Sequence, residues 1–289
     1  MRNRFTAFIS AVAAAAVGAI IAATALPLNG QTTAYRAPRT PDGRPDLNGI
    51  WQAISEANYD VEMHMARAAM QLRPGPYGPV PAAPVLAFGA VGSVPPGMGV
   101  TDGPLPYKPE ALAKKKDNQE HWVERDPEIK CYLPGVPRAN YMPYPFQILQ
   151  SQSAVFFAYE YAGAVRNVYL KDPGPAPIDS WMGQSVGRWE GETLVIDANG
   201  FNDSSWFDRA GNFHSDALQV TERYTRVAAD VLNYEATITD ANVFTRPWKI
   251  QMPLYRRLEK NAQLMDFKCV EFVEELLYGQ WRKRPLTKD

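Results

Sequence analysis

Residues 146–170, FQILQSQSAVFFAYEYAGAVRNVYL, decide the fold class of this chain. Three runs within this stretch, Phe146–Gln150, Ala154–Tyr161 and Ala164–Leu170, are rich in aromatic and β-branched residues. Such runs favour strands, and the short separators between them favour antiparallel neighbours. The stretch therefore predicts the start of an antiparallel β-meander.

The same pattern continues toward the C-terminus. Further strand-like runs occupy Gly187–Trp189, Glu192–Asp197, Ala217–Val227, Val231–Ile238, Ile250–Glu259 and Phe267–Phe272, with a tight turn expected at Glu190-Gly191. No long helical pattern separates these runs, which argues against a parallel α/β sheet. Because closure removes exposed edges, we predict a mainly β fold, a lipocalin-like barrel over residues 131–289. A two-sheet β-sandwich is the alternative.

Residues 26–130 have a different character. The segment Thr40–Trp51 contains prolines and glycines that argue against regular structure over most of its length, although Leu47, Ile50 and Trp51 could dock on a core. Residues 53–72 have a helical spacing of apolar residues, and residues 73–109 are rich in proline and glycine. Pro109 then begins a short basic helix that runs toward Trp122. We therefore expect an extension of loops and short helices.

The first 25 residues resemble a secretory signal peptide. Arg2 and Arg4 precede an Ala-rich apolar run over residues 5–21, and residues 23–25 offer small side chains for cleavage. The alternative is a retained membrane anchor, but the cleavage triplet favours removal. The sequence thus predicts a periplasmic or secreted protein without stable membrane insertion after cleavage. Of 30 Lys and Arg and 31 Asp and Glu, cleavage removes the two arginines, so the mature chain is slightly acidic and nucleic acid is not an expected partner.

Two cysteines remain, Cys131 and Cys269. In an oxidising compartment an isolated pair favours one disulfide over two free thiols. We expect this disulfide to join the beginning of the β region to its last strand. The prediction also concerns closure, because a closed barrel brings first and last strands together, whereas an open sandwich could leave the two cysteines on different edges.

The densest polar cluster lies in residues 200–216, a segment long enough to favour a functional loop. His214 could act as a general base oriented by Asp208 or Asp216, with Trp206 and Phe213 as walls of a ligand site. The alternative is that Asp203, Asp208 and Asn212 only make turn hydrogen bonds while the aromatic rings plug one barrel end. A metal site would need more ligands than this loop supplies, so none is expected.

The next strand carries a second polar signal. Alternation places Leu218, Val220, Glu222, Tyr224 and Arg226 on one face. Buried charges need partners, so an interior Glu222 paired with Arg226 would mark a polar spot in a ligand cavity, with Tyr224 beside it. Equally, Glu222 could tie down the barrel end at the rim. No dinucleotide fingerprint, phosphate loop or Gly-x-Ser-x-Gly elbow is present, so no cofactor is expected.

Three blocks are similar to those of a large group of uncharacterised exported proteins from environmental bacteria. They are residues 41–51 (PDGRPDLNGIW), 131–138 (CYLPGVPR) and 185–197 (SVGRWEGETLVID), the last running on to residues 200–203 and 214–216. The resemblance implies export and a barrel-like domain. It implies no activity and no catalytic residues.

Two functions follow as hypotheses. The first is a barrel that binds a small, partly apolar molecule and, if it is an enzyme, transforms it by cofactor-free acid–base chemistry as a lyase, isomerase or hydrolase. In that reading His214, Asp208, Asp216 and Glu222 carry the chemistry, and Trp206, Phe213, Tyr224 and Arg226 contact the ligand. The second is a non-catalytic binding or structural module of the cell envelope, with a barrel filled by its own side chains.

Overall fold

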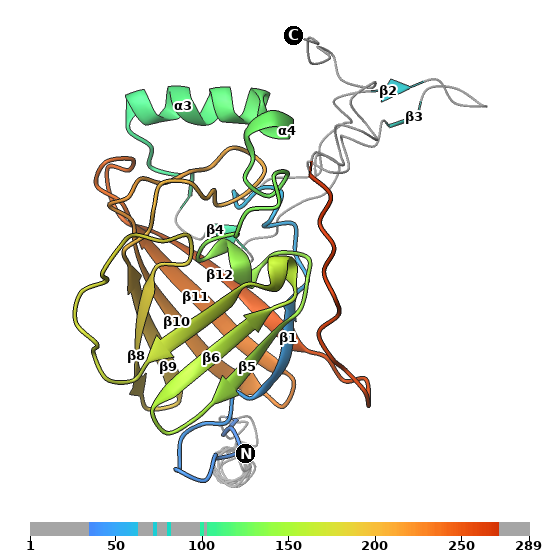
Figure 1. Ribbon diagram of the computed structural model, residues 1–289, viewed down its shortest axis with the longest axis vertical. Coiled ribbons are helices and arrows are strands. Elements are labelled where there is room, and N and C mark those ends of the chain that lie inside the picture. The colour runs from blue at the N-terminus through green and yellow to red at the C-terminus, as the bar shows by residue number, and fades with distance from the viewer. Residues whose placement is uncertain (1–34, 63–71, 74–79, 82–98, 101–102, 272–289) are drawn as a thin grey trace, which may run out of the picture. The chain divides into compact units, whose positions relative to one another are not determined.

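The computed structural model describes residues 35–62, 72–73, 80–81, 99–100 and 103–271 (Figure 1). The predicted signal segment, the C-terminal residues 272–289 and most of the Pro- and Gly-rich stretch lie outside these residues. A compact unit begins at Arg36. Its main feature is a closed β-barrel, which confirms the predicted fold class and excludes the open sandwich.

Nine strands of the described chain close this barrel in the order β1-β5-β6-β7-β8-β9-β10-β11-β12, and β12 returns to β1. Their bounds are β1 Gly49–Ala53, β5 Phe146–Gln150, β6 Ala154–Tyr159, β7 Val165–Tyr169, β8 Gln184–Glu190, β9 Thr193–Asn199, β10 Gln219–Ala228, β11 Val231–Thr239 and β12 Trp248–Arg256. Outside the closed ring, β4 (Gly99–Val100) pairs with β12, and β2 (Leu72–Arg73) pairs with β3 (Val80–Pro81). The described residues form the helices α3 (Pro109–Glu120) and α4 (Trp122–Arg125) and the 3₁₀ turns η1 (Arg138–Asn140) and η2 (Tyr161–Gly163).

The strand that closes the barrel is not the one predicted. Residues 267–271 form no strand, and β1 from the N-terminal extension lies between β5 and β12 instead. Trp51 pairs with Phe146 on one side and with Arg256 on the other. The prolines of residues 40–51 all precede Gly49, so they do not remove a donor from this strand. The extension therefore supplies part of the barrel, and the barrel begins before residue 131.

The meander has one irregular connection. β7 and β8 run parallel, with Val168 opposite Ser185, whereas every other pair of neighbours in the barrel is antiparallel. Residues 170–183 make the required crossover and lie beside the start of the next long loop, where Ser180 pairs with Phe201. The barrel thus departs from an all-antiparallel lipocalin design.

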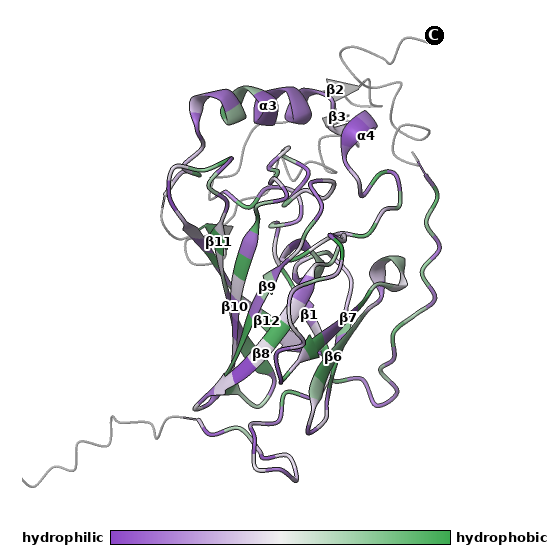
Figure 2. Cartoon of the chain, turned by 60° about the vertical axis from the view of Figure 1, so that its left-hand side comes forward, coloured by the Kyte–Doolittle hydropathy of each residue, from purple (hydrophilic) through white to green (hydrophobic). Residues whose placement is uncertain are grey.

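Local predictions are mostly confirmed, with two corrections. The β8–β9 turn lies at Gly191-Glu192, one residue later than expected, because Gly191 adopts the positive φ (+60°) that such a turn requires. The helix predicted from Pro109 forms as α3 and α4, and Figure 2 shows that most of their residues are hydrophilic. The helical spacing of residues 53–72 does not produce a helix over residues 54–62, and residues 63–71 lie outside the described part.

Alternation along the strands defines the interior. On β10 the inward residues Val220, Glu222, Tyr224 and Arg226 are buried, and β11 and β12 alternate in the same way. Chain segments cover both ends of the barrel. At one end η1 and residues 200–216 lie beneath α3 and α4 (Figure 1). At the other, Arg226 donates to the Asp46 carbonyl and Arg256 to the Asn48 carbonyl.

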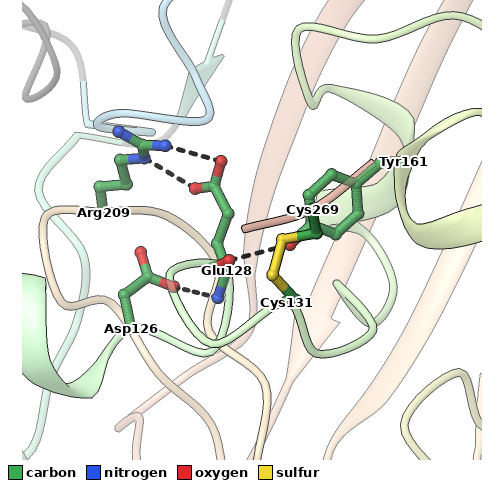
Figure 3. Close-up of a disulfide and its surroundings, with 6 residues drawn as sticks. All are labelled: Asp126, Glu128, Cys131, Tyr161, Arg209 and Cys269. Carbon is green, nitrogen blue, oxygen red and sulfur yellow. Dashed lines mark hydrogen bonds and ion pairs between the residues drawn. A yellow bond between two sulfur atoms is a disulfide. The ribbon is translucent and has the colours of Figure 1, made fainter. Parts of the chain in front are cut away.

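The predicted disulfide is confirmed between Cys131 and Cys269, whose Cα atoms lie 5.8 Å apart. Its structural context differs from the prediction, because Cys269 lies in an extended segment outside the barrel ring and not in a last strand. The bond therefore fastens the C-terminal segment to the residues that precede η1 (Figure 3). Nearby, the Tyr161 hydroxyl donates to the Glu128 carbonyl, and the Phe267 ring packs on Tyr161.

Candidate functional site

Glu222 lies at the centre of the polar cluster inside the barrel. Its side chain is completely buried and accepts hydrogen bonds from the Asn140 amide (2.8 Å), the Tyr234 hydroxyl (2.8 Å) and the Tyr224 hydroxyl (3.0 Å). Its second oxygen pairs with Arg166. The interior interpretation of Glu222 is therefore right, but its partner is not Arg226, which faces the far end of the barrel.

The cluster is assembled from distant parts of the chain. Arg166 comes from β7, Ser185 from β8, and Asn140 enters the barrel mouth on η1. Arg166 Nε donates to Ser185 Oγ (2.8 Å), and the Tyr159 hydroxyl donates to Asn140 Oδ1 (3.1 Å). Inward alternation on β6 and β7 could have indicated Tyr159 and Arg166 from the sequence, but nothing local indicated Asn140.

Burial and charge fix the protonation of this cluster. Burial raises the pKa values of Tyr224 and Tyr234 well above their ordinary value, and the nearby Glu222 carboxylate raises them further. Burial opposes the charge of Arg166, but Glu222 beside it raises the pKa of the guanidinium above its ordinary value. The tyrosines therefore remain hydrogen-bond donors, and Arg166 remains a cation.

One donor in the cluster is unused. Arg166 is 3% exposed, and its Nη1 atom has no hydrogen-bond partner among the described residues. The Phe157 ring lies 5.6 Å from the guanidinium carbon, and Phe157 also packs against Tyr159 and Tyr224. A charged N–H thus lies unsatisfied among aromatic rings inside the barrel. Buried polar groups are nearly always satisfied, so this atom calls for an acceptor.

The loop of residues 200–216 forms a second polar group. His214 is buried, and both ring nitrogens have a partner: Nε2 lies 2.8 Å from Ser205 Oγ, and Nδ1 lies 2.8 Å from the Ser215 carbonyl oxygen. Neither Asp208 nor Asp216 orients the ring, so that part of the prediction is wrong. The orienting group is a backbone carbonyl, which neighbour spacing in the sequence does not reveal.

Asp208 has a structural role in this loop. Its carboxylate accepts hydrogen bonds from the Val61 amide (2.8 Å) and from the backbone and side chain of Asn212, which confirms the turn interpretation for these two residues. Burial, together with the nearby charge of Asp60, raises the pKa of Asp208 to about 7. Asp216 is exposed.

The predicted ligand-binding residues are not brought together. Trp206 and Phe213 pair with each other in the loop at the α3 end, where Lys114 of α3 lies 4.4 Å from the centre of the Phe213 ring. Tyr224 lies within the Glu222 cluster, and Arg226 contacts the far-end cover. A single site therefore cannot use all four.

A buried ion network that the sequence did not indicate includes Asp126, Glu128 and Arg209, which Figure 3 shows close together. Arg138 forms a bidentate pair with Asp126 and also binds Glu128, and Arg209 forms two hydrogen bonds with Glu128. Although burial opposes its charge, Arg209 and Arg138 lower the pKa of Glu128 to about 2. The network joins η1 to the loop of residues 200–216. Its members lie in segments without periodicity, so no pattern marked them.

No protein-family model, curated protein or solved structure matches this chain. Within the described part of the chain, no group of three or more His, Cys, Asp or Glu residues could hold a metal ion. Among the same residues, no helix is long and apolar enough to cross a membrane.

Proposed function

We propose that this protein is exported and that its barrel binds a small, partly apolar molecule through a hydrogen-bond acceptor placed on Arg166 Nη1. The N-terminal sequence of residues 1–25 and the disulfide support export, because disulfides persist in oxidising compartments. The observation that carries the binding proposal is the buried, unpaired Nη1.

The chemistry of the cluster selects the acceptor. Glu222 already neutralises Arg166, so a second carboxylate beside it would meet like-charge repulsion in a buried site. A neutral carbonyl oxygen satisfies Nη1 without adding charge. The rings of Phe157, Tyr159 and Tyr224 offer apolar contact for the rest of the molecule. A small ketone, ester or amide with an apolar body therefore fits best.

Matched ligands test the role of the acceptor. Acetophenone and ethylbenzene have similar shapes, but only the ketone can accept a hydrogen bond from Nη1. A hydrogen bond to a charged group contributes about 1.5–3 kcal/mol, so we expect the ketone to bind about 10- to 100-fold more tightly. Tryptophan fluorescence and thermal shift would measure both affinities, and benzoate should bind more weakly than acetophenone.

A variant pair locates the site. Arg166→Lys keeps the positive charge but loses the planar fork, and should reduce ketone affinity at least tenfold. Arg223→Lys on the outer face of β10 is the matched control and should not. Equal binding of both ligands would contradict the proposal. The proposal would also be contradicted if no ligand bound and a structure showed only an ordered water on Nη1. That outcome would favour the non-catalytic structural module.

A further inference from the structure

Ser205 and His214 face each other on the two strands of one short ladder within the loop of residues 200–216. Trp206 and Phe213 form an antiparallel bridge, and the Phe207 amide donates to the Asn212 carbonyl (2.7 Å). The residues just outside that bridge, Ser205 and His214, are thereby placed side by side. Their 2.8 Å contact follows from the ladder and does not depend on a long flexible side chain.

The hydrogen bonds of His214 determine its tautomer. The Ser215 carbonyl can only accept, so Nδ1 carries the proton and Nε2 accepts from the Ser205 hydroxyl. Burial, with Phe201 and Phe207 packed around the ring, lowers the pKa of His214, which keeps the imidazole neutral at pH 7. A neutral imidazole that accepts from a serine hydroxyl is the arrangement of a general base and its nucleophile.

The orienting carbonyl is itself held in place. The Ser215 backbone amide donates to Asp240 Oδ2 (2.6 Å), and its hydroxyl donates to Asp240 Oδ1 (2.9 Å). Asp240 is buried and follows directly after β11, so the barrel wall supports it. The chain of contacts Asp240–Ser215–His214–Ser205 therefore supplies a nucleophile, a base and a fixed third group.

The surroundings of the hydroxyl indicate an electrophile of small size. Gly135, at φ +71°, brings its backbone so close that a Cβ there would stand 2.2 Å from Ser205 Oγ and 3.3 Å from the Trp181 carbonyl oxygen. The Trp181 ring lies 5.1 Å from that of the exposed Tyr132. Ser205 itself is 2% exposed, but its neighbour Ser204 is at the surface. The hydroxyl thus belongs to a buried residue that directly follows an exposed one.

We propose that Ser205 is a nucleophile for small esters of apolar acids, with His214 as its general base. Ser205 Oγ attacks the ester carbonyl carbon while its proton passes to His214 Nε2. The carbon–oxygen bond to the alcohol breaks, and the alcohol leaves with that proton. Water then attacks the acyl-serine in the same way, which releases the acid and restores the serine. This site is separate from Arg166 and stands whether or not the barrel binds a ligand.

Covalent labelling tests the nucleophile directly. Phenylmethanesulfonyl fluoride forms an Oγ–sulfur bond and releases fluoride, with the serine proton taken up by the base. We expect a single adduct on the full-length oxidised protein, assigned to Ser205 by peptide mass spectrometry. Ser204→Ala should label at the wild-type rate, whereas His214→Gln should label at least 100-fold more slowly. Hydrolysis of p-nitrophenyl butyrate should be lost in Ser205→Ala and kept in Ser204→Ala.

The pH profile distinguishes a base from a structural partner. Because burial lowers the pKa of His214, the labelling rate should stay constant down to a pH below the ordinary histidine pKa of about 6.5, and fall only at still lower pH as the imidazole takes up a proton. The proposal is overturned by any of three results: no adduct after hours at pH 8, an adduct on another residue, or equal labelling of wild type and His214→Gln. The first two results are obtained with wild-type protein alone, so the proposal can be tested even if a variant fails to fold.

Discussion

Replacing Glu222 with glutamine tests whether the Arg166–Glu222 pair organises the barrel interior. The substitution keeps the shape of the side chain but removes the charge that neutralises a guanidinium with 3% exposure. It also turns one acceptor oxygen into a donor that faces other donors, the Asn140 amide among them. Breaking a buried ion pair by removing one partner costs about 3–5 kcal/mol.

The magnitude can be measured by urea unfolding followed by tryptophan fluorescence and circular dichroism. We expect Glu222→Gln to lower the free energy of unfolding by about 3–5 kcal/mol and Tm by about 6–20 °C. Glu235 is half-exposed on the outer face of β11, so Glu235→Gln is the matched control. It should change the free energy of unfolding by less than about 1 kcal/mol.

A double variant separates the charge from the packing. In Glu222→Gln/Arg166→Met the uncompensated cation is gone, so we expect about 2 kcal/mol or more of the loss to return, in line with other buried pairs replaced by apolar residues. A cost below about 1 kcal/mol for Glu222→Gln would refute the reasoning, as would additivity of the two single substitutions. Either result would mean that water reaches the pair and screens it.

Three further predictions concern other parts of the molecule. The pKa of Asp208 in the folded protein is raised to about 7, so its protonated carboxyl stabilises the folded state at low pH, and this contribution is lost as pH rises through 7. In urea titrations, the free energy of unfolding of wild type relative to D208N should therefore fall by a few kcal/mol between pH 5 and 8. Buried His214 contributes to stability with the opposite pH dependence, but it does so in both proteins and cancels from the comparison. A difference in unfolding free energy that does not change with pH would contradict the raised pKa of Asp208. The disulfide closes a span of 138 residues, so replacing Cys131 and Cys269 with serine should lower unfolding stability by about 5 kcal/mol in the chain-entropy model, and thiol titration of the unreduced, denatured protein should detect no free thiol. Gly135→Ala should destabilise by about 2 kcal/mol more than Gly174→Ala, since both have positive φ but only the first meets a side chain within 3 Å; equal thermal shifts would argue against the close approach.

Local chemistry is sufficient to predict much of the fold. The aromatic and β-branched runs indicate β5, β6, β7, β10 and β11 to within a few residues, because alternation and β-propensity act over neighbouring positions. Alternation alone also places Glu222 and Tyr224 on the inward face of β10, where both are buried. The cysteine pair and its oxidising context predict the disulfide.

Partners across the barrel cannot be predicted in the same way. The sequence favours Arg226 for Glu222, since the two share a strand face, whereas curvature of the barrel brings Arg166 on β7 across to it. Residue type and setting make His214 a candidate base, but its contacts with Ser205 and the Ser215 carbonyl depend on how the loop folds into a ladder.

Residue identity and spacing are enough to predict most of the strands, their inward faces and the cysteine pairing, because each of these depends on the residues themselves and their near neighbours. The assembled tertiary structure decides that β1, and not residues 267–271, closes the barrel. It also decides that β7 and β8 run parallel, and which buried charges meet. These outcomes depend on which distant segments best cover exposed strand edges and pair with buried ions. Such contacts join residues far apart in the sequence, so they are decided only when the whole chain is folded.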